Sequence, residues 1–199
     1  DYNQFSKSLN DKEIIAEQQL TKLVEAQPID LSYSEKFTQL NKTKGLSFYI
    51  IDRNKLIYWT NRSIQFSGDL NEFEKDNGLV KLKNGWYQYL IKKSNQKTYL
   101  ALILIKNDYN IKNKYLTNTF HHSFRIKDNQ EIITFKNENS TEITDVNGES
   151  LLGFRQIKQK ESSTKTNNWL LFFFFCSGYL SLISFASKKT RKSVSLRNF

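Results

Sequence analysis

Cysteine and proline are nearly absent from this chain of 199 residues, which contains one of each. The single cysteine, Cys176, excludes a disulfide or a thiolate metal site within one chain. The only histidines are His121 and His122, and adjacent residues on a strand point to opposite faces of a sheet. Asp108 and Asp128 are near them in the sequence, but the spacing matches no common metal site. We therefore expect no metal and no cofactor.

Sequence motifs of hydrolases, nucleotide-binding loops and zinc proteases are also missing. The carboxylates are scattered, and no pair is spaced for acid–base catalysis. Asp52, Asp69, Glu72 and Glu74 are in or beside segments that look like solvated loops. We expect that this chain is not an enzyme by itself.

The net charge of +10 is unevenly distributed. Residues 188–199 contain five Lys or Arg and no acid, whereas acids and bases are interspersed in the remainder of the chain. A protein that binds nucleic acid concentrates basic charge on one face of its folded domain. The pattern favours a short basic tail and no nucleic-acid partner.

One uncharged apolar run, residues 169–187, separates Lys165 from the basic tail. A helix needs about 20 apolar residues to cross the hydrocarbon of a bilayer, so this run predicts one transmembrane helix. Trp169 marks one interface, and positive charge stays on the cytoplasmic side, where we place Lys188, Lys189, Arg191 and Lys192. The chain is then expected in a bacterial inner (cytoplasmic) membrane, with its N-terminal domain periplasmic or extracellular. Export of that domain predicts an upstream membrane helix or signal.

The first part of the chain has a helical period. Apolar residues recur three, four and seven positions apart from residue 3 to residue 26, and Pro28 ends the pattern. These residues are Phe5, Leu9, Ala16, Leu20 and Leu23. The motif Ser32-x-x-Glu35 predicts a second helix over 32–44, which Gly45 stops.

From residue 46 onward the pattern changes to strands. Strong strand patterns meet at the turns Arg53-Asn54, Asn84-Gly85 and Ser94-Asn95-Gln96, and Asn-Gly between strands is a strong hairpin signal. They cover 46–52, 55–60, 78–83, 86–93 and 97–107, with a loop over 61–78. A short helix or turn is expected over 111–120. Weaker strands follow at 123–126, 131–136, 142–146 and 151–158.

This element order predicts an α+β fold with an antiparallel sheet and a long N-terminal helix, followed by one transmembrane helix. The arrangement is PAS-like or Cache-like. We expect N-terminal helices over 1–44, an extracytoplasmic sensor domain over 45–159 and a juxtamembrane linker over 160–168. The transmembrane helix covers 169–187 and the basic cytoplasmic tail covers 188–199.

Several short motifs appear in a fixed order between residues 45 and 155. They are Tyr58-Trp59, Asn84-Gly85-Trp86-Tyr87, and Leu104-Ile105-Lys106 followed by Tyr109, Asn113, Tyr115-Leu116 and Phe120. In this order the chain resembles the sensor region of membrane-bound histidine kinases of Bacteroidetes-type bacteria. The resemblance implies a two-component system for signal transduction, in which an external domain and a membrane helix precede a cytoplasmic kinase.

The kinase half of that pattern is not in this sequence. His121-His122 is followed by Ser-Phe-Arg, which is not a phosphoacceptor motif, and no ATP-binding box is present. Two alternatives therefore stay open. One is a sensor domain of another receptor class, such as a cyclase or chemoreceptor, and the other is a single-span surface protein with a structural or adhesive role.

Aromatic residues on the predicted strands are the best candidates for a ligand pocket, because a small organic ligand favours an aromatic lining with a few polar groups. Tyr87 and Tyr89 should share one face of the sheet, with Trp86 on the other. The ligand-binding set is Tyr58, Trp59, Trp86, Tyr87, Tyr89, Lys106 and Tyr109. The alternative is that these rings form only the core, and that a partner protein or membrane stress is the stimulus. We expect a homodimer with the long N-terminal helix at its interface.

Overall fold

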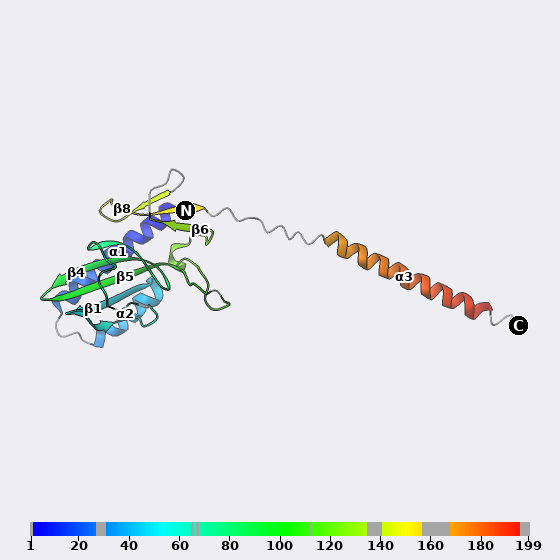
Figure 1. The fold of residues 1–199 in the computed structure, drawn as a ribbon, viewed down its shortest axis with the longest axis horizontal. Coiled ribbons are helices and arrows are strands. Elements are labelled where there is room, and N and C mark those ends of the chain that lie inside the picture. Colours follow the sequence, from blue (N-terminus) through cyan, green and yellow to red (C-terminus); the bar gives the residue numbers. More distant parts are fainter. Residues whose placement is uncertain are drawn as a thin grey trace. The chain divides into compact units, whose positions relative to one another are not determined.

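A computed structural model describes residues 2–26, 31–64, 66, 68–111, 113–134, 141–156 and 168–195. The chain forms two compact units, Asp1–Ile157 and Lys158–Phe199. The first unit is a mixed α+β domain with a long N-terminal helix and an antiparallel sheet, as the sequence predicts (Figure 1). The described residues of the second unit, 168–195, form one helix.

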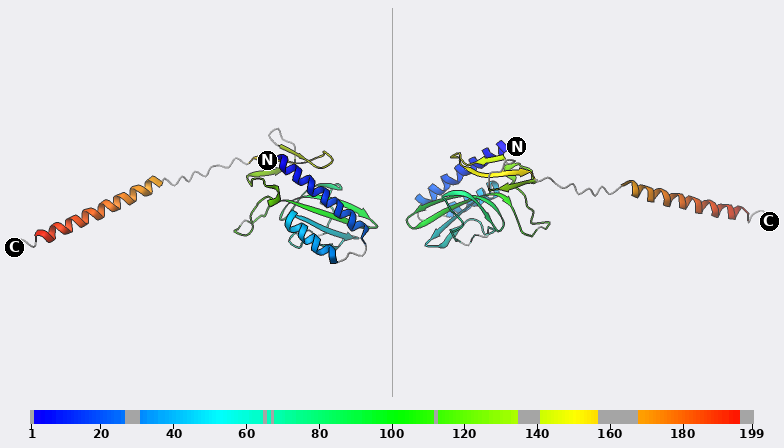
Figure 2. Two further views of the ribbon diagram at one scale, coloured as in Figure 1. Left: turned by 180° about the vertical axis from the view of Figure 1, so that it is seen from behind. Right: turned by 45° about the horizontal axis from the view of Figure 1, so that its top comes forward.

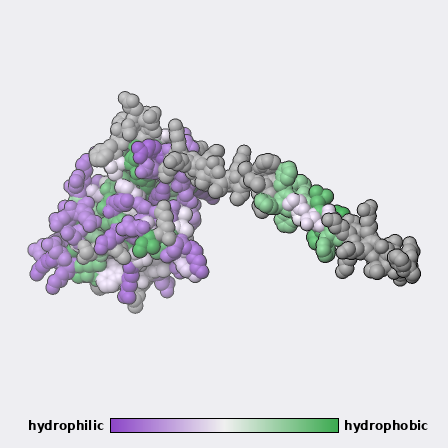
Figure 3. Space-filling model, turned by 45° about the vertical axis from the view of Figure 1, so that its right-hand side comes forward, coloured by the Kyte–Doolittle hydropathy of each residue, from purple (hydrophilic) through white to green (hydrophobic). Residues whose placement is uncertain are grey.

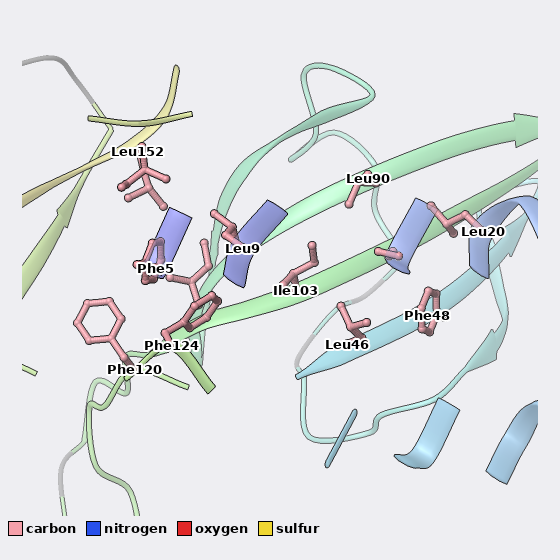
Figure 4. Close-up of a cluster of buried hydrophobic side chains, with 14 of the residues drawn as sticks. Phe5, Leu9, Leu20, Leu46, Phe48, Leu90, Ile103, Phe120, Phe124 and Leu152 are labelled. Atoms are coloured by element: carbon pink, nitrogen blue, oxygen red, sulfur yellow. The ribbon is translucent and has the colours of Figure 1, made fainter. Parts of the chain in front are cut away.

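Helix α1 (Tyr2–Glu25) lies along one face of the main sheet. Its five predicted apolar positions, from Phe5 to Leu23, are all fully buried, which confirms the stripe seen in the sequence. Figure 4 shows Phe5, Leu9 and Leu20 in one cluster with side chains of the strands below. The outward face of α1 is polar except for Ile14, which is 47% exposed.

Helix α2 (Leu31–Lys44) packs on strand β1 and ends at Gly45. Gly45 has a φ of 71°, and its N–H donates to the Asn41 carbonyl oxygen at 2.9 Å. A left-handed residue in this position closes a helix, and glycine adopts it without strain. The predicted stop at Gly45 is confirmed.

The main sheet has five antiparallel strands in the order β2-β1-β5-β4-β3. Their bounds are Leu46–Asp52 (β1), Lys55–Trp59 (β2), Asn77–Leu82 (β3), Gly85–Ser94 (β4) and Lys97–Asn107 (β5). Arg53-Asn54 and Asn95-Gln96 all have positive φ, which matches the twist of two-residue hairpins. The third hairpin turns at Lys83-Asn84, with Leu82 paired to Gly85, so all three predicted hairpins are confirmed, the third with its turn one residue earlier than expected.

Side chains alternate between two cores on opposite faces of the main sheet. Phe48 and Ile50 face the helices, whereas Tyr49 and Ile51 face away from them. The second face is covered by the segment 60–76, which contributes Ile64, Phe66 and Phe73 to its core. The predicted loop over 61–78 is therefore the cover of a hydrophobic core.

A second, three-stranded sheet has the order β6-β8-β7. Its strands are Gln130–Ile133 (β6), Thr141–Thr144 (β7) and Ser150–Gln156 (β8), close to three of the predicted strands. Phe154 of β8 packs edge-on against Phe5 of α1, with ring centroids 4.8 Å apart. The views in Figure 2 show this sheet beside the first half of α1. The sequence did not indicate that the strands would divide into two separate sheets.

The predicted strand over 123–126 is wrong. His122–Phe124 is instead one 3-10 turn, η1, after which Arg125 has a φ of 53°. The Ser123 N–H and hydroxyl both lie within hydrogen-bond distance of His121 Nδ1, and this local bonding favours a turn. The turn places Phe124 in the core against Phe5, with centroids 4.4 Å apart. No helix forms over the described residues of 111–120, which are bends and irregular backbone that end in an isolated bridge between Phe120 and Lys106.

Helix α3 spans Asn168–Ser195 and contains the predicted transmembrane segment. Its described side chains, residues 172–185, are all exposed and include four consecutive phenylalanines. Figure 3 shows that much of this surface is hydrophobic. Among the described residues, no helix has the length and hydropathy that a membrane crossing requires. The span over 169–187 thus stays a prediction. The side chains of Trp169, Lys188, Lys189, Arg191 and Lys192, and most of the predicted linker, lie outside the described residues.

Candidate functional site

The predicted aromatic set is divided between the two faces of the main sheet. Tyr87 and Tyr89 lie in the core beneath the segment 60–76, where they are 1% and 3% exposed. Trp86 and Tyr58 pack instead at the edge of the helix-facing core. The alternation predicted from the sequence is correct, so these residues do not line a single pocket.

Two other members of the set lie at separate places on the surface. Trp59 is 39% exposed, and the Arg62 guanidinium carbon is 5.7 Å from its ring centroid. Tyr109 follows the end of β5, and its N–H donates to the Asn118 side-chain oxygen at 2.9 Å. Of the two, only Tyr109 lies close enough to another member of the set to act on it, since it contributes to the raised pKa of Tyr87.

Trp86 and Lys106 do converge, on a hollow of about 420 Å³. We call it the polar hollow and define it by Lys81, Trp86, Lys106, Asp108, Asn118, Asp128, Glu131 and Ile132. Strand register builds one wall, because Lys81 pairs with Trp86 and Trp86 pairs with Lys106 across β3, β4 and β5. Strand β6 and the segment after β5 supply the remaining residues.

Charges of both signs line the polar hollow. Lys81 Nζ lies 2.8 Å from Asp108 Oδ2, and Asn118 Nδ2 donates to Asp108 Oδ1 at 2.9 Å. Lys106 Nζ donates to the Gln130 carbonyl oxygen at 2.6 Å and lies 4.5 Å from the centroid of the Phe120 ring. The lining therefore holds its ammonium groups in fixed positions.

The acidic side of the hollow is equally organised. Asp128 Oδ1 accepts the Phe120 N–H at 2.8 Å, and Glu131 forms an ion pair with Arg155 at 2.6 Å. A carboxylate has about four acceptor positions, so Asp128 retains the capacity to accept from a ligand. Fixed ammonium and carboxylate groups beside an indole ring suit a small polar molecule with charges of both signs.

Sequence reasoning identified only two of the residues that line the hollow as ligand-binding. The row Lys81–Trp86–Lys106 follows from the hairpin registers and was within reach of the sequence. Asp108 and Asp128 were considered only as metal ligands. No cluster of three or more His, Cys, Asp or Glu in the described part of the chain is placed to hold a metal ion.

A buried polar network connects α1 to both sheets. Asn77 Nδ2 donates to Glu13 Oε1 at 2.9 Å and to Asp145 Oδ2 at 3.0 Å. The Val146 N–H donates to Glu13 Oε2 at 3.3 Å, and Gln88 Nε2 donates to Asn77 Oδ1 at 3.4 Å. Burial raises the pKa of Glu13, although these donors oppose the shift. The network ties α1 to β3, β4 and the turn after β7.

A buried lysine lies next to Glu13 on the same helix. Lys12 is 2% exposed, and its Nζ has no hydrogen-bond partner among the described residues. The ammonium group lies 3.7 Å from the centroid of the Phe124 ring. Burial, with a smaller contribution from Lys44, lowers the pKa of Lys12 to about 7.

His121 occupies the same region and is 8% exposed. Burial lowers the pKa of His121 to about 3, and the charges of Lys12 and His122 add to the effect. Its ring packs so closely against Gly45 that a Cβ there would be 2.9 Å from His121 Cδ2. The imidazole is therefore neutral at physiological pH.

No protein-family model matches the chain, and neither a curated protein nor a solved structure shows significant similarity to it.

Proposed function

We propose that this chain is the stimulus-sensing extracytoplasmic domain and membrane anchor of a two-component sensor histidine kinase. The observation that carries the proposal is the pairing of a folded α+β domain with a separate helix whose described side chains are all exposed and mainly apolar. The PAS-like or Cache-like assignment is part of this proposal, and the five-stranded antiparallel sheet under a long N-terminal helix supports it.

The anchor is helix α3. Phe172 to Phe175 are 62–79% exposed, and Leu182 and Phe185 are 68% and 70% exposed. Most of this exposed surface is apolar, interrupted by Ser177, Ser181 and Ser184, and exposed phenylalanine and leucine side chains are more stable in hydrocarbon than in water. The basic residues that follow position 187 orient the helix with its C-terminal end in the cytoplasm.

The sensing site is the polar hollow, which contacts the start of α1 through shared neighbours. Gln130 accepts from Lys106 through its carbonyl oxygen and from the Tyr2 hydroxyl through its side chain, at 2.6 and 3.0 Å. Phe120 donates its N–H to Asp128, and its ring packs edge-on against that of Phe5 with centroids 6.5 Å apart. A ligand that favours one arrangement of these groups shifts the position of α1.

Anchoring is tested by carbonate extraction of membranes that contain the full chain. We expect the wild type to stay in the pellet and Phe174→Asp/Leu182→Asp to be released, because two charges in the apolar helix oppose insertion. The matched control, Asn95→Asp/Asn110→Asp, adds the same charges on exposed turns of the domain and should stay in the pellet. Release of the wild type would refute the anchor.

Sensing is tested by a thermal-shift screen of the full chain with small zwitterionic and polar compounds. A ligand at 100 times its Kd adds about 2.7 kcal/mol to the free energy of unfolding. Asp128→Asn should lose the response, since it removes the charge but keeps an acceptor for Phe120. Asp69→Asn is the control, because Asp69 also accepts a backbone N–H, that of Asn71. A hit that both variants retain would place the ligand elsewhere.

A further inference from the structure

The segment 108–121, which we call the β5–β6 loop, exposes two large apolar side chains at its tip. Ile111 is 73% exposed and Tyr115 is 79% exposed. Among the described residues of the first unit, the next most exposed large hydrophobic is Ile57 at 50%. Single exposed hydrophobic residues are common on protein surfaces, but two of them four residues apart on one loop are a candidate place of contact with a membrane or another protein.

The tip is held by its own hydrogen bonds. Asn113 Oδ1 accepts the N–H groups of Tyr115 and Leu116 at 2.8 and 2.9 Å. At the base of the loop, the Asn107 N–H donates to the Thr119 carbonyl oxygen at 2.9 Å. The exposure of Ile111 and Tyr115 is therefore a property of an organised loop.

Between Asp108, which forms an ion pair with Lys81, and Asp128, the charged residues are all basic. Residues 109–127 contain four Lys or Arg and no Asp or Glu. Lys114 Nζ lies 4.8 Å from the centroid of the Tyr115 ring at the tip, and Arg125 and Lys127 are exposed. Tyrosine beside lysine is typical of a bilayer interface, and clustered basic residues attract anionic lipid headgroups.

The loop projects from the end of the domain at which the chain leaves toward α3. Gln156, the last residue of β8, pairs with Gln130, and Gln130 accepts from Lys106 at the base of the loop. Figures 1 and 2 show the loop at the same end of the domain as the end of β8. The hairpin turn at Asn95 lies at the opposite end of β4 and β5.

We infer that the β5–β6 loop docks on the surface of a bilayer that contains anionic phospholipid. Ile111 and Tyr115 enter the interfacial layer, and Lys114 pairs with phosphate groups. The inference rests on the proposed anchor, which brings the domain to the membrane, but it concerns a separate contact. It gives the domain a fixed orientation, so that a change at the adjacent polar hollow acts against the bilayer surface.

The test uses the full chain with Cys176→Ser in lipid nanodiscs, with a bimane label at Asn110→Cys or at the control site Asn95→Cys. Nitroxide-labelled headgroups quench dyes at the lipid surface. In discs with phosphatidylglycerol we expect quenching at 110 to be at least about threefold stronger than at 95, and to fall in phosphatidylcholine alone. Ile111→Ser/Tyr115→Ser should reduce it to the level at 95.

Failure of the anchor and failure of the docking have different signatures. A chain that does not co-elute with the nanodiscs refutes the anchor. A chain that co-elutes but shows equal quenching at 110 and 95 in anionic discs refutes the docking. Equal quenching at 110 in both lipids also overturns the inference. So does a change in bimane emission at 110 that grows with protein concentration in detergent without lipid, which would identify a second copy of the chain as the occupant.

Discussion

Replacement of the buried Lys12 by methionine should stabilise the domain in a manner that depends on pH. The structure places the Lys12 ammonium group against Phe124, with Lys44 and His121 as the other titratable groups that act on it. Burial lowers the pKa of Lys12 from 10.5 to about 7. Methionine has a similar length and needs neither a proton nor a hydrogen bond.

The size of the effect follows from proton linkage. Each pKa unit between folded and unfolded states corresponds to about 1.4 kcal/mol, so burial of the protonated amine costs about 5 kcal/mol. Between about pH 7 and pH 10.5 the unfolded chain binds more protons than the folded one, so stability rises with pH. Deprotonation of Lys12 should therefore raise the wild-type free energy of unfolding by about 3 kcal/mol as the pH increases from 7 to 9.5.

The assay is urea unfolding of the full chain in mild detergent, followed by tryptophan fluorescence from pH 6 to 9.5. The range stops there because burial raises the pKa of Tyr49 and Tyr87, whose ionisation in the unfolded chain lowers stability above about pH 10. The gain from Lys12→Met should be largest near pH 6 and shrink as the pH rises. Lys7→Met, on the exposed face of α1, is the control. A gain from Lys12→Met that is independent of pH would refute the reasoning.

Three further predictions concern the same region. His121 has a folded pKa of about 3, so acidification from about pH 6.5 to 4 should destabilise the domain, and His121→Gln should weaken this dependence while His122→Gln should not. Asn77→Ala removes the shared donor of two carboxylates and should lower the free energy of unfolding by about 2–4 kcal/mol in urea titrations, against little change for the exposed Asn71→Ala. Phe5→Ala should cost about 3–5 kcal/mol in the same assay, because the ring joins α1 to η1 and β8, and a loss below about 1 kcal/mol would contradict that role.

The hairpins and α1 were predictable because local signals and tertiary packing agree there. The signal at Asn84-Gly85 locates the β3–β4 hairpin to within one residue, and the apolar stripe of α1 meets the sheet. The turn at His122–Phe124 was not predicted, since its residues resemble a strand, whereas the bonding of Ser123 to His121 and the packing of Phe124 against Phe5 favour a turn.

The buried charges on α1 show a different limit. Lys12 and Glu13 follow Leu9 by three and four positions, so the helical period alone places them on the covered face. Sequence reasoning passed over them because charged residues are seldom buried. Their partners come from distant segments, such as Asn77 and Asp145, which no local pattern brings together.

The candidate site was predictable only where it depends on the register of the hairpins. Lys81, Trp86 and Lys106 form a row that the strand registers determine. Asn118 and Asp128 lie at the polar hollow because of the path of the β5–β6 loop and the residues after it. That path depends on side-chain to backbone hydrogen bonds, such as the one from the Phe120 N–H to Asp128, which the sequence pattern does not reveal.

The central claim is that α3 crosses a membrane with the folded domain outside the cytoplasm. It is tested most directly by labelling single cysteines with an impermeant maleimide in intact spheroplasts that make the chain from its native gene, with Cys176→Ser as background. Asn95→Cys in the domain should react before lysis, and Ser195→Cys at the end of α3 only after lysis. Equal labelling at both sites before lysis would contradict the claim, as would recovery of the chain in the soluble fraction after the membranes are sedimented.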